Sequence, residues 1–251
     1  MQHQKIQIET PDGRCRTHVY HPDSAGPWPG VIVYMDAVGW RPAMMEIAER
    51  IANAGYFVLL PDLFYRVEFD VSKGLGLFSD PVIRDDMMKR VMPSASPTNV
   101  VRDTQAFLEY LDAQPNVIHD KIGIVGYCMG GRLALYIAGN FGDRIAAAGI
   151  YHAGGVATEA PDSPHRLAPQ IRAKLYIGGA MEDPGFDQNA QDRLSKALDD
   201  AGVDYTLEMY AARHGWVPTD TPMHDAVAAA RHWETLFELF DEALGSESVR
   251  R

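Results

Sequence analysis

The chain has 251 residues, of which 46% are hydrophobic and 23% charged, a balance typical of a globular protein with a sizeable core. Its formal net charge of −11 opposes phosphate backbones and anionic membranes, so we expect neither nucleic acid nor a membrane as partner. Two cysteines, Cys15 and Cys128, are too few for a disulfide framework, and no His or Cys spacing suggests a metal site. Without a signal segment at the start, the sequence predicts a cytoplasmic protein that needs no cofactor.

The first predicted elements are short and rich in β-forming residues. Segments 5–9 and 16–21 flank a Pro-Asp-Gly turn at 11–13, which predicts an N-terminal β-hairpin. The runs GVIVY (30–34) and YFVLL (56–60) are continuously apolar, as expected of strands buried on both faces. Between these two runs, apolar residues recur at helical spacing.

Residues 63–98 interrupt this rhythm. Glycines and prolines break the segment repeatedly, yet its Phe, Tyr and Met side chains make it too apolar for a solvated linker. We interpret 63–98 as a cap-like insertion lying over the top of the sheet. The alternative is a mobile surface excursion.

Strands and helices alternate again after residue 98. Apolar runs predict strands, and helical periodicity predicts the helices between them. The strands are expected at 121–126, 145–151, 174–178 and 205–210, and the helices at 101–111, 133–138, 194–201 and 226–240. This alternation predicts a single α/β domain over residues 1–251, with a mostly parallel sheet covered by helices on both faces.

The segment Gly126-Tyr127-Cys128-Met129-Gly130 stands between a predicted strand and a predicted helix. This is the glycine-flanked nucleophile turn of an α/β-hydrolase fold. A side chain at either glycine position would collide with the neighbouring backbone. The turn places Cys128 at a helix N-terminus, where the helix dipole favours a thiolate. The alternative is a structural cysteine in a glycine-rich turn.

A nucleophile of this kind needs an acid and a histidine later in the chain, each after a strand. Asp183 follows the strand predicted at 174–178, and His214 follows the one predicted at 205–210. His214 is the expected base, and Asp183 would hold its imidazole in the correct tautomer. Glu182 is the rival for the acid.

An oxyanion hole requires two backbone N–H groups. One is expected from Met129, the residue after the nucleophile, and the other from the loop after strand 30–34, where counting favours Ala37.

These motifs resemble the dienelactone hydrolase family, also called carboxymethylenebutenolidases. The matching segments are VIVYMDAVGW, PDLFYR, VGYCMGG, GGAMEDP and RHGW, so the resemblance covers most of the chain. It implies hydrolysis of a small ester or lactone through a thioester, with catalytic roles for Cys128, Asp183 and His214.

Two positions depart from the family pattern. Asp36 stands where well-studied members carry a glutamate that takes part in thiol activation, and Pro218 replaces an arginine that helps to hold the substrate carboxylate. Arg84 falls near the other carboxylate-binding arginine of the family. Because one carboxylate-binding arginine of the family is replaced, we expect this protein to prefer neutral or monoanionic substrates.

The remaining candidates for substrate contact are Asp36, Arg84, Tyr127 and Trp216. Asp36 could instead be a structural turn residue, Trp216 a core residue, and Arg84 a solvated arginine of the insertion. His152 follows a strand and could line the pocket or belong to the core.

Two other functions stay open at this point. A thioesterase or acyltransferase could use the same fold, with the acyl group leaving Cys128 for an acceptor other than water. A non-catalytic ligand-binding or redox-sensing protein could use Cys128 for reversible oxidation, although such a sensor needs no orienting acid. The oligomeric state is not predicted.

Overall fold

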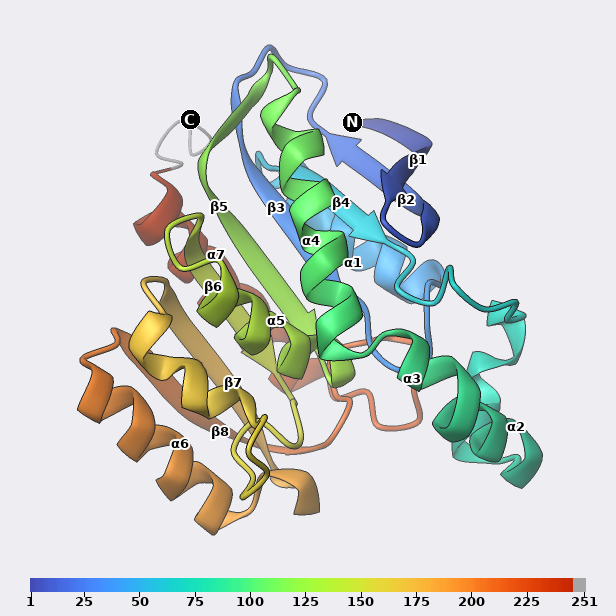
Figure 1. Ribbon diagram of the computed structural model, residues 1–251, viewed down its shortest axis with the longest axis vertical. Helices are drawn as coiled ribbons and strands as arrows, with labels where there is room; N and C mark the ends of the chain where they lie inside the picture. The colour runs from blue at the N-terminus through green and yellow to red at the C-terminus, as the bar shows by residue number, and fades with distance from the viewer. Residues whose placement is uncertain (246–251) are drawn as a thin grey trace. The chain divides into compact units, whose positions relative to one another are not determined.

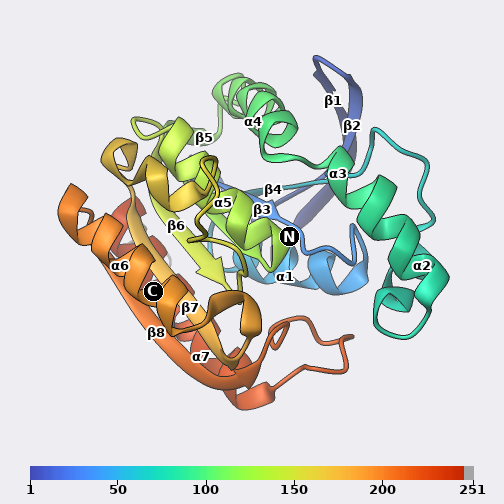
Figure 2. The same cartoon turned by 60° about the horizontal axis from the view of Figure 1, so that its bottom comes forward.

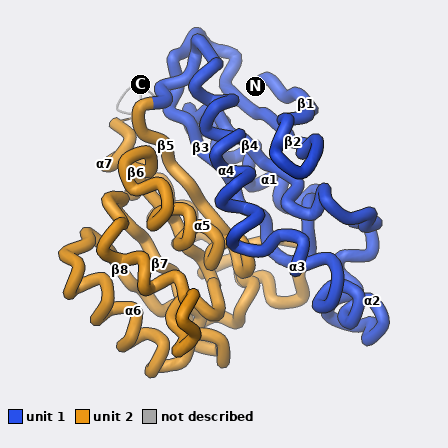
Figure 3. Tube along the Cα trace, in the orientation of Figure 1, with its two compact units in different colours: residues 1–119 blue, residues 120–251 orange. Residues whose placement is uncertain are grey.

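The structure is a computed structural model that describes residues 1–245, so the last part of the predicted domain, 246–251, lies outside it. The chain divides into two compact units, residues 1–119 and residues 120–251 (Figures 1 and 3). The single domain expected over 1–251 therefore stays a prediction, and each unit is described by itself.

The first unit contains four strands in the order β1-β2-β4-β3. The β1–β2 and β2–β4 pairs are antiparallel, whereas β3 and β4 run parallel. Thr10 pairs with Gly13 at the tip of the first pair, where Gly13 adopts φ 133°, so the predicted N-terminal hairpin is confirmed. The strands are β1 (Gln2–Thr10), β2 (Gly13–His21), β3 (Trp28–Tyr34) and β4 (Phe57–Pro61).

Two long helices cover this part of the sheet from opposite faces, α1 (Pro42–Asn53) and α4 (Pro97–Asp112) (Figure 1). Helix α1 buries the apolar stripe that includes Met44, Ile47 and Ile51, which is the periodicity seen in the sequence. It packs on β2 and β4, while α4 packs on β1. Both helices begin with proline at a position where the missing N–H costs nothing.

The segment 63–98 is a succession of short helices rather than an open loop. The elements are η1 (Val71–Phe78), α2 (Pro81–Asp86), η2 (Met87–Val91) and α3 (Met92–Ser94). Arg66 anchors the start of the segment, because its guanidinium forms ion pairs with Asp12 in the hairpin turn at 2.9 Å and Asp103 of α4 at 2.6 Å. Its role as a substrate cap stays a prediction.

The second unit contains four parallel strands in the order β5-β6-β7-β8. They are β5 (Val117–Tyr127), which begins just before the unit boundary, β6 (Ile145–Tyr151), β7 (Lys174–Glu182) and β8 (Tyr205–Arg213). Short 3₁₀ turns precede and follow β7, η3 (Pro164–Gln170) and η4 (Pro184–Phe186). The carboxyl ends of β5 to β8 therefore lie at one edge, where residues from separate strands converge.

Three helices flank these strands, α5 (Met129–Asn140), α6 (Gln188–Ala201) and α7 (Ala226–Leu244). Figures 1 and 2 show α5 and α6 on one face and α7 on the other. Mostly parallel strands with helices on both faces, preceded by an antiparallel hairpin, confirm the predicted fold class. Within residues 1–245, none of the helices combines the length and apolarity needed to cross a bilayer.

Candidate active site

Cys128 occupies a sharp turn between β5 and α5. Its backbone has φ 53° and ψ −115°, a conformation that residues with a side chain rarely adopt. A Cβ on Gly126 would stand 2.0 Å from the carbonyl oxygen of Gly130, so residue 126 must be glycine for the turn to close. This is the steric requirement that the sequence spacing implied.

Backbone hydrogen bonds fix this turn, which we call the elbow, on both sides of Cys128. The N–H of Cys128 donates to the carbonyl of Tyr151 at the end of β6, at 3.0 Å, and the Cys128 carbonyl accepts from Gly131 and Arg132 in the first turn of α5. The cysteine is half-buried and caps the N-terminus of a 12-residue helix. A partial positive charge therefore lies beside the sulfur.

His214 and Asp183 meet at the carboxyl ends of β8 and β7. His214 Nδ1 lies 2.6 Å from Asp183 Oδ2, and the other carboxylate oxygen of Asp183 accepts the N–H of Gly185 at 2.8 Å. The Asp183 carboxylate is nearly buried, with 6% of its side chain exposed. Glu182, the rival acid, is exposed on the last residue of β7. The structure thus pairs the histidine with Asp183.

The surroundings of the His214 imidazole stabilise its protonated form. Burial alone would lower its pKa, but hydrogen bonds to Asp183 and to Cys128, together with their charges, raise the pKa of His214 to about 10. Cys128, His214 and Asp183 therefore form one hydrogen-bonded chain within the second unit. A thiol hydrogen-bonded to an imidazole is the arrangement that nucleophilic catalysis by cysteine requires.

Two residues expected to contact substrate lie in the core instead. Tyr127 is fully buried and its hydroxyl lies 3.0 Å from His232 Nε2. Trp216 is also fully buried and stacks on Tyr210, with ring centroids 4.7 Å apart. Both side chains are fully buried in this structure, so a contact of either with substrate stays a prediction. Each of the two residues directly follows a glycine of a predicted functional motif. The motif alone does not reveal whether the side chain points into the core or toward a ligand.

Two predicted residues of the first unit have defined surroundings. Arg84 is exposed, and its guanidinium donates to the carbonyls of Leu77 and Phe78, so it caps the end of η1. Ala37 is buried in the loop after β3. Its pairing with Met129 in one oxyanion hole stays a prediction, as does a substrate contact by Arg84.

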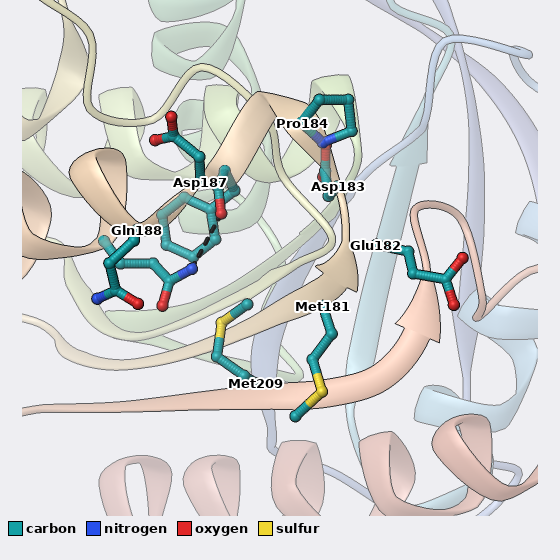
Figure 4. Close-up of a pocket in the computed structure, with 9 residues that line it drawn as sticks. Met181, Glu182, Asp183, Pro184, Asp187, Gln188 and Met209 are labelled. Carbon is teal, nitrogen blue, oxygen red and sulfur yellow. Dashed lines mark hydrogen bonds between the residues drawn. The ribbon is translucent and has the colours of Figure 1, made fainter.

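An open pocket of about 730 Å³ lies beside the acid loop (Figure 4). Its walls include Met181, Glu182, Asp183, Phe186, Asp187 and Met209. In Figure 4 the carboxylate of Glu182 points away from Asp187 and Gln188. The pocket touches Asp183 but is not lined by Cys128 or His214. Residues 1–245 contain no cluster of three or more His, Cys, Asp or Glu side chains that could hold a metal ion.

The family model for the dienelactone hydrolase family matches residues 15–244. The chain belongs to the dienelactone hydrolase family. A carboxymethylenebutenolidase of Pseudomonas sp. (strain P51) is 30% identical over 220 residues, which cover 84% of this chain and 82% of that protein. The chain is accordingly a hydrolase of the carboxymethylenebutenolidase type, a class that acts on ester and lactone bonds.

Solved structures show the same fold. A Klebsiella pneumoniae protein superposes with a TM-score of 0.84 at 20% identity, covering 96% of this chain and 98% of that one. The dienelactone hydrolase of Anabaena variabilis superposes with a TM-score of 0.68 at 16% identity, with the same coverage of both chains. At these identities the likeness concerns the α/β-hydrolase fold.

The family departure at Asp36 has a physical explanation. Both carboxylate oxygens of Asp36 bond to the guanidinium of Arg41, at 2.6 Å and 3.1 Å, and Oδ1 also accepts the N–H of Val38. Asp36 and Arg41 are each only about 5% exposed. Asp36 is therefore a turn residue held in a buried ion pair, and a contact with substrate stays a prediction. Arg41 was not among the residues predicted from the sequence, although it follows Asp36 by only five residues.

Proposed function

We propose that this member of the family is a cysteine-dependent hydrolase of small esters or lactones that works through a thioester. The observation that carries the proposal is the chain of hydrogen bonds from Cys128 through His214 to Asp183, on a turn strained at the cysteine itself. A structural cysteine would need neither the strain nor the partners.

In the first half of the proposed reaction, the Cys128 thiolate attacks the carbonyl carbon of the ester. A C–S bond forms, and the carbonyl oxygen takes the negative charge, which the Met129 and Ala37 N–H groups would stabilise. When the carbonyl re-forms, the C–O bond to the alcohol breaks. The His214 imidazolium gives its proton to the leaving alkoxide, which stays tethered if the substrate is a lactone.

In the second half, water attacks the thioester carbon. His214, now neutral, takes one proton from the water as the new C–O bond forms. The C–S bond then breaks, which releases the acid and restores the thiolate–imidazolium pair. Asp183 keeps the Nδ1 proton in place throughout and thereby holds Nε2 toward the sulfur.

The proposed substrates are neutral or monoanionic. Pro218 is buried and cannot take the place of the carboxylate-binding arginine of the family, and Arg84 is occupied by backbone carbonyls. The net charge of −11 adds a field that opposes anions. A dianionic substrate would therefore need a cation that these two positions do not supply.

A panel of aryl esters, simple lactones and dienelactones should be screened against the wild type and Cys128→Ala. Rapid quenching with a slow ester should trap a covalent adduct, which peptide mass spectrometry is expected to place on Cys128. An adduct elsewhere, or turnover by Cys128→Ala at the wild-type rate, would refute the proposal.

Competing alcohols and thiols in the same assay identify the acyl acceptor. Free acid as the sole product supports a hydrolase. A product ester or thioester that grows with acceptor concentration would instead indicate an acyltransferase.

A further inference from the structure

His152 is the most unusual residue near the proposed active site. It lies directly after β6, is fully buried, and has φ 40°. Among residues 1–245, only Cys128 shares a positive φ with it outside glycine. Both ring nitrogens of His152 are buried without a hydrogen-bond partner. Strained backbone and unpaired buried nitrogens both cost free energy, so the position calls for an explanation.

The backbone around His152 ties it to the elbow. The N–H of His152 donates to the carbonyl of Gly178 on β7 at 2.8 Å. The preceding residue, Tyr151, accepts the N–H of Cys128 at 3.0 Å. The backbone of residues 151 and 152 is therefore bonded to the ends of both β5 and β7, next to the turn that carries Cys128.

The ring itself packs against the proposed base. The centroids of the His152 and His214 rings are 5.5 Å apart with an interplanar angle of 64°, an edge-to-face contact. Trp216 makes a similar contact from another side, at 4.8 Å and 70°. Burial, together with the charges of His214 and His232, holds the pKa of His152 well below its ordinary value, so this ring is uncharged.

We propose that His152 is a positioning residue for His214, which it orients by edge-to-face packing and not by a hydrogen bond. The inference rests on the proposed function of His214 as the base. Asp183 bonds one side of the His214 imidazole and Cys128 bonds the other, but neither hydrogen bond limits the tilt of the ring about the line that joins them. A rigid, uncharged ring packed edge-to-face with the imidazole restricts that tilt and keeps Nε2 directed at Cys128.

The positive φ explains why the packing ring is a histidine. Residue 152 adopts φ 40°, which histidine tolerates better than larger or β-branched residues do. Phenylalanine would supply an equivalent ring without unpaired nitrogens, but with more backbone strain. Histidine meets both requirements of the position, a flat ring that packs on His214 and a backbone that adopts positive φ.

Two substitutions separate the ring from the backbone. His152→Asn keeps a residue that tolerates positive φ and removes the ring. We expect kcat to fall by about 10- to 100-fold with KM changed by less than about threefold, because a misdirected base affects the chemical step. Iodoacetamide should inactivate this variant more slowly by a similar factor, since that reaction reports on Cys128 and His214 without substrate.

His152→Phe restores the ring at the expense of backbone strain. We expect kcat within about threefold of the wild type and a lower Tm. The matched control is His165→Asn, another buried histidine of the same unit, whose ring bonds Ser163 Oγ at 2.8 Å. That control should keep the wild-type kcat and alkylation rate, even if its Tm falls.

A His152→Asn enzyme with wild-type kcat would overturn the proposal. Equal losses in the Asn and Phe variants would also overturn it, because the ring nitrogens would then matter and not the packing. If the Asn variant does not fold, His152→Phe decides alone, by retained or lost kcat. These results differ from a failure of the proposed function, which would appear as a wild-type enzyme that forms no thioester.

Discussion

The two cysteines of this chain occupy opposite kinds of environment. Cys15 lies in β2, fully buried, and its S–H faces the backbone carbonyls of Asp62 and Arg16 at 3.5 Å and 3.6 Å. Burial, reinforced by the charges of Asp103 and Asp62, raises the pKa of the Cys15 thiol far above its ordinary value. Cys128 is half-buried at a helix N-terminus, with an imidazole beside it.

The difference shows that the reactivity of a thiol is decided by what surrounds it. At Cys15, carbonyl oxygens and carboxylates stabilise the proton on sulfur, so the group behaves as a small apolar side chain. At Cys128, a helix N-terminus and the hydrogen bond to His214 place positive charge beside the sulfur. Each of the following predictions tests one part of this contrast.

The largest effect is expected from removing the sulfur of Cys128, with the sulfur of Cys15 as the comparison. Cys128→Ala should lower kcat/KM for a responsive ester by at least about 10³-fold, because only binding and the oxyanion hole remain. Cys15→Ala should keep activity within about twofold and lose some stability through the small cavity it leaves. Steady-state assays and thermal melts of both variants check the pair. An inactive but folded Cys15→Ala enzyme would contradict the contrast.

The next effect concerns the acid that orients the imidazole. Asp183→Asn should lower kcat by about 10²- to 10³-fold, because an amide at this position favours the wrong tautomer of His214. Glu182→Gln is the matched control, since Glu182 is the exposed neighbour without the contact to His214. If Glu182→Gln lost activity and Asp183→Asn kept it, Glu182 and not Asp183 would be the acid that orients His214.

A smaller effect is expected in chemical labelling. Under native conditions iodoacetamide should modify Cys128 at least about 10²-fold faster than Cys15, because the thiolate is the reacting species and Cys15 is inaccessible. Peptide mapping over time measures both rates in one sample. In denaturant the two rates should converge, and native labelling of Cys15 before Cys128 would be incompatible with this placement of the sulfurs.

The smallest effect is a dependence of stability on pH. The folded-state pKa of His214 is about 10, above the ordinary value of 6.5, so its contribution to stability is complete below about pH 6.5. It declines as the pH rises and is lost above about pH 10. The Tm difference between the wild type and His214→Asn should therefore shrink by a few degrees from pH 6 to pH 10. A difference that grows with pH would reverse the assigned charge state.

Periodicity and local chemistry were enough to predict much of this fold. The apolar runs at 30–34 and 56–60 became β3 and β4, and the glycine-flanked cysteine became the turn between β5 and α5. These features depend on residues close together in sequence, so the sequence carries their signal. The short helices inside 63–98 were not expected, because three- to eight-residue helices leave little periodicity to detect.

The features that were missed depend on tertiary contacts. Arg41 neutralises Asp36 only because the loop after β3 folds back on itself. Tyr127 and Trp216 stand next to predicted functional residues, but the direction of their side chains is decided by packing against His232 and Tyr210. The positive φ of His152 likewise has no local signature comparable to a glycine.

The close approach of Gly126 to Gly130 bears on how this enzyme could change over evolutionary time. Because any side chain at 126 would strike the carbonyl of Gly130, substitutions there remove the turn itself. Residue 128, by contrast, is held through its own backbone, by Tyr151 on one side and α5 on the other. The backbone of the elbow therefore restricts residue 126 to glycine, whereas it does not restrict the side chain at position 128 in the same way. A single-base change from cysteine to serine would place oxygen where the sulfur of the proposed nucleophile lies, without a change in the surrounding backbone.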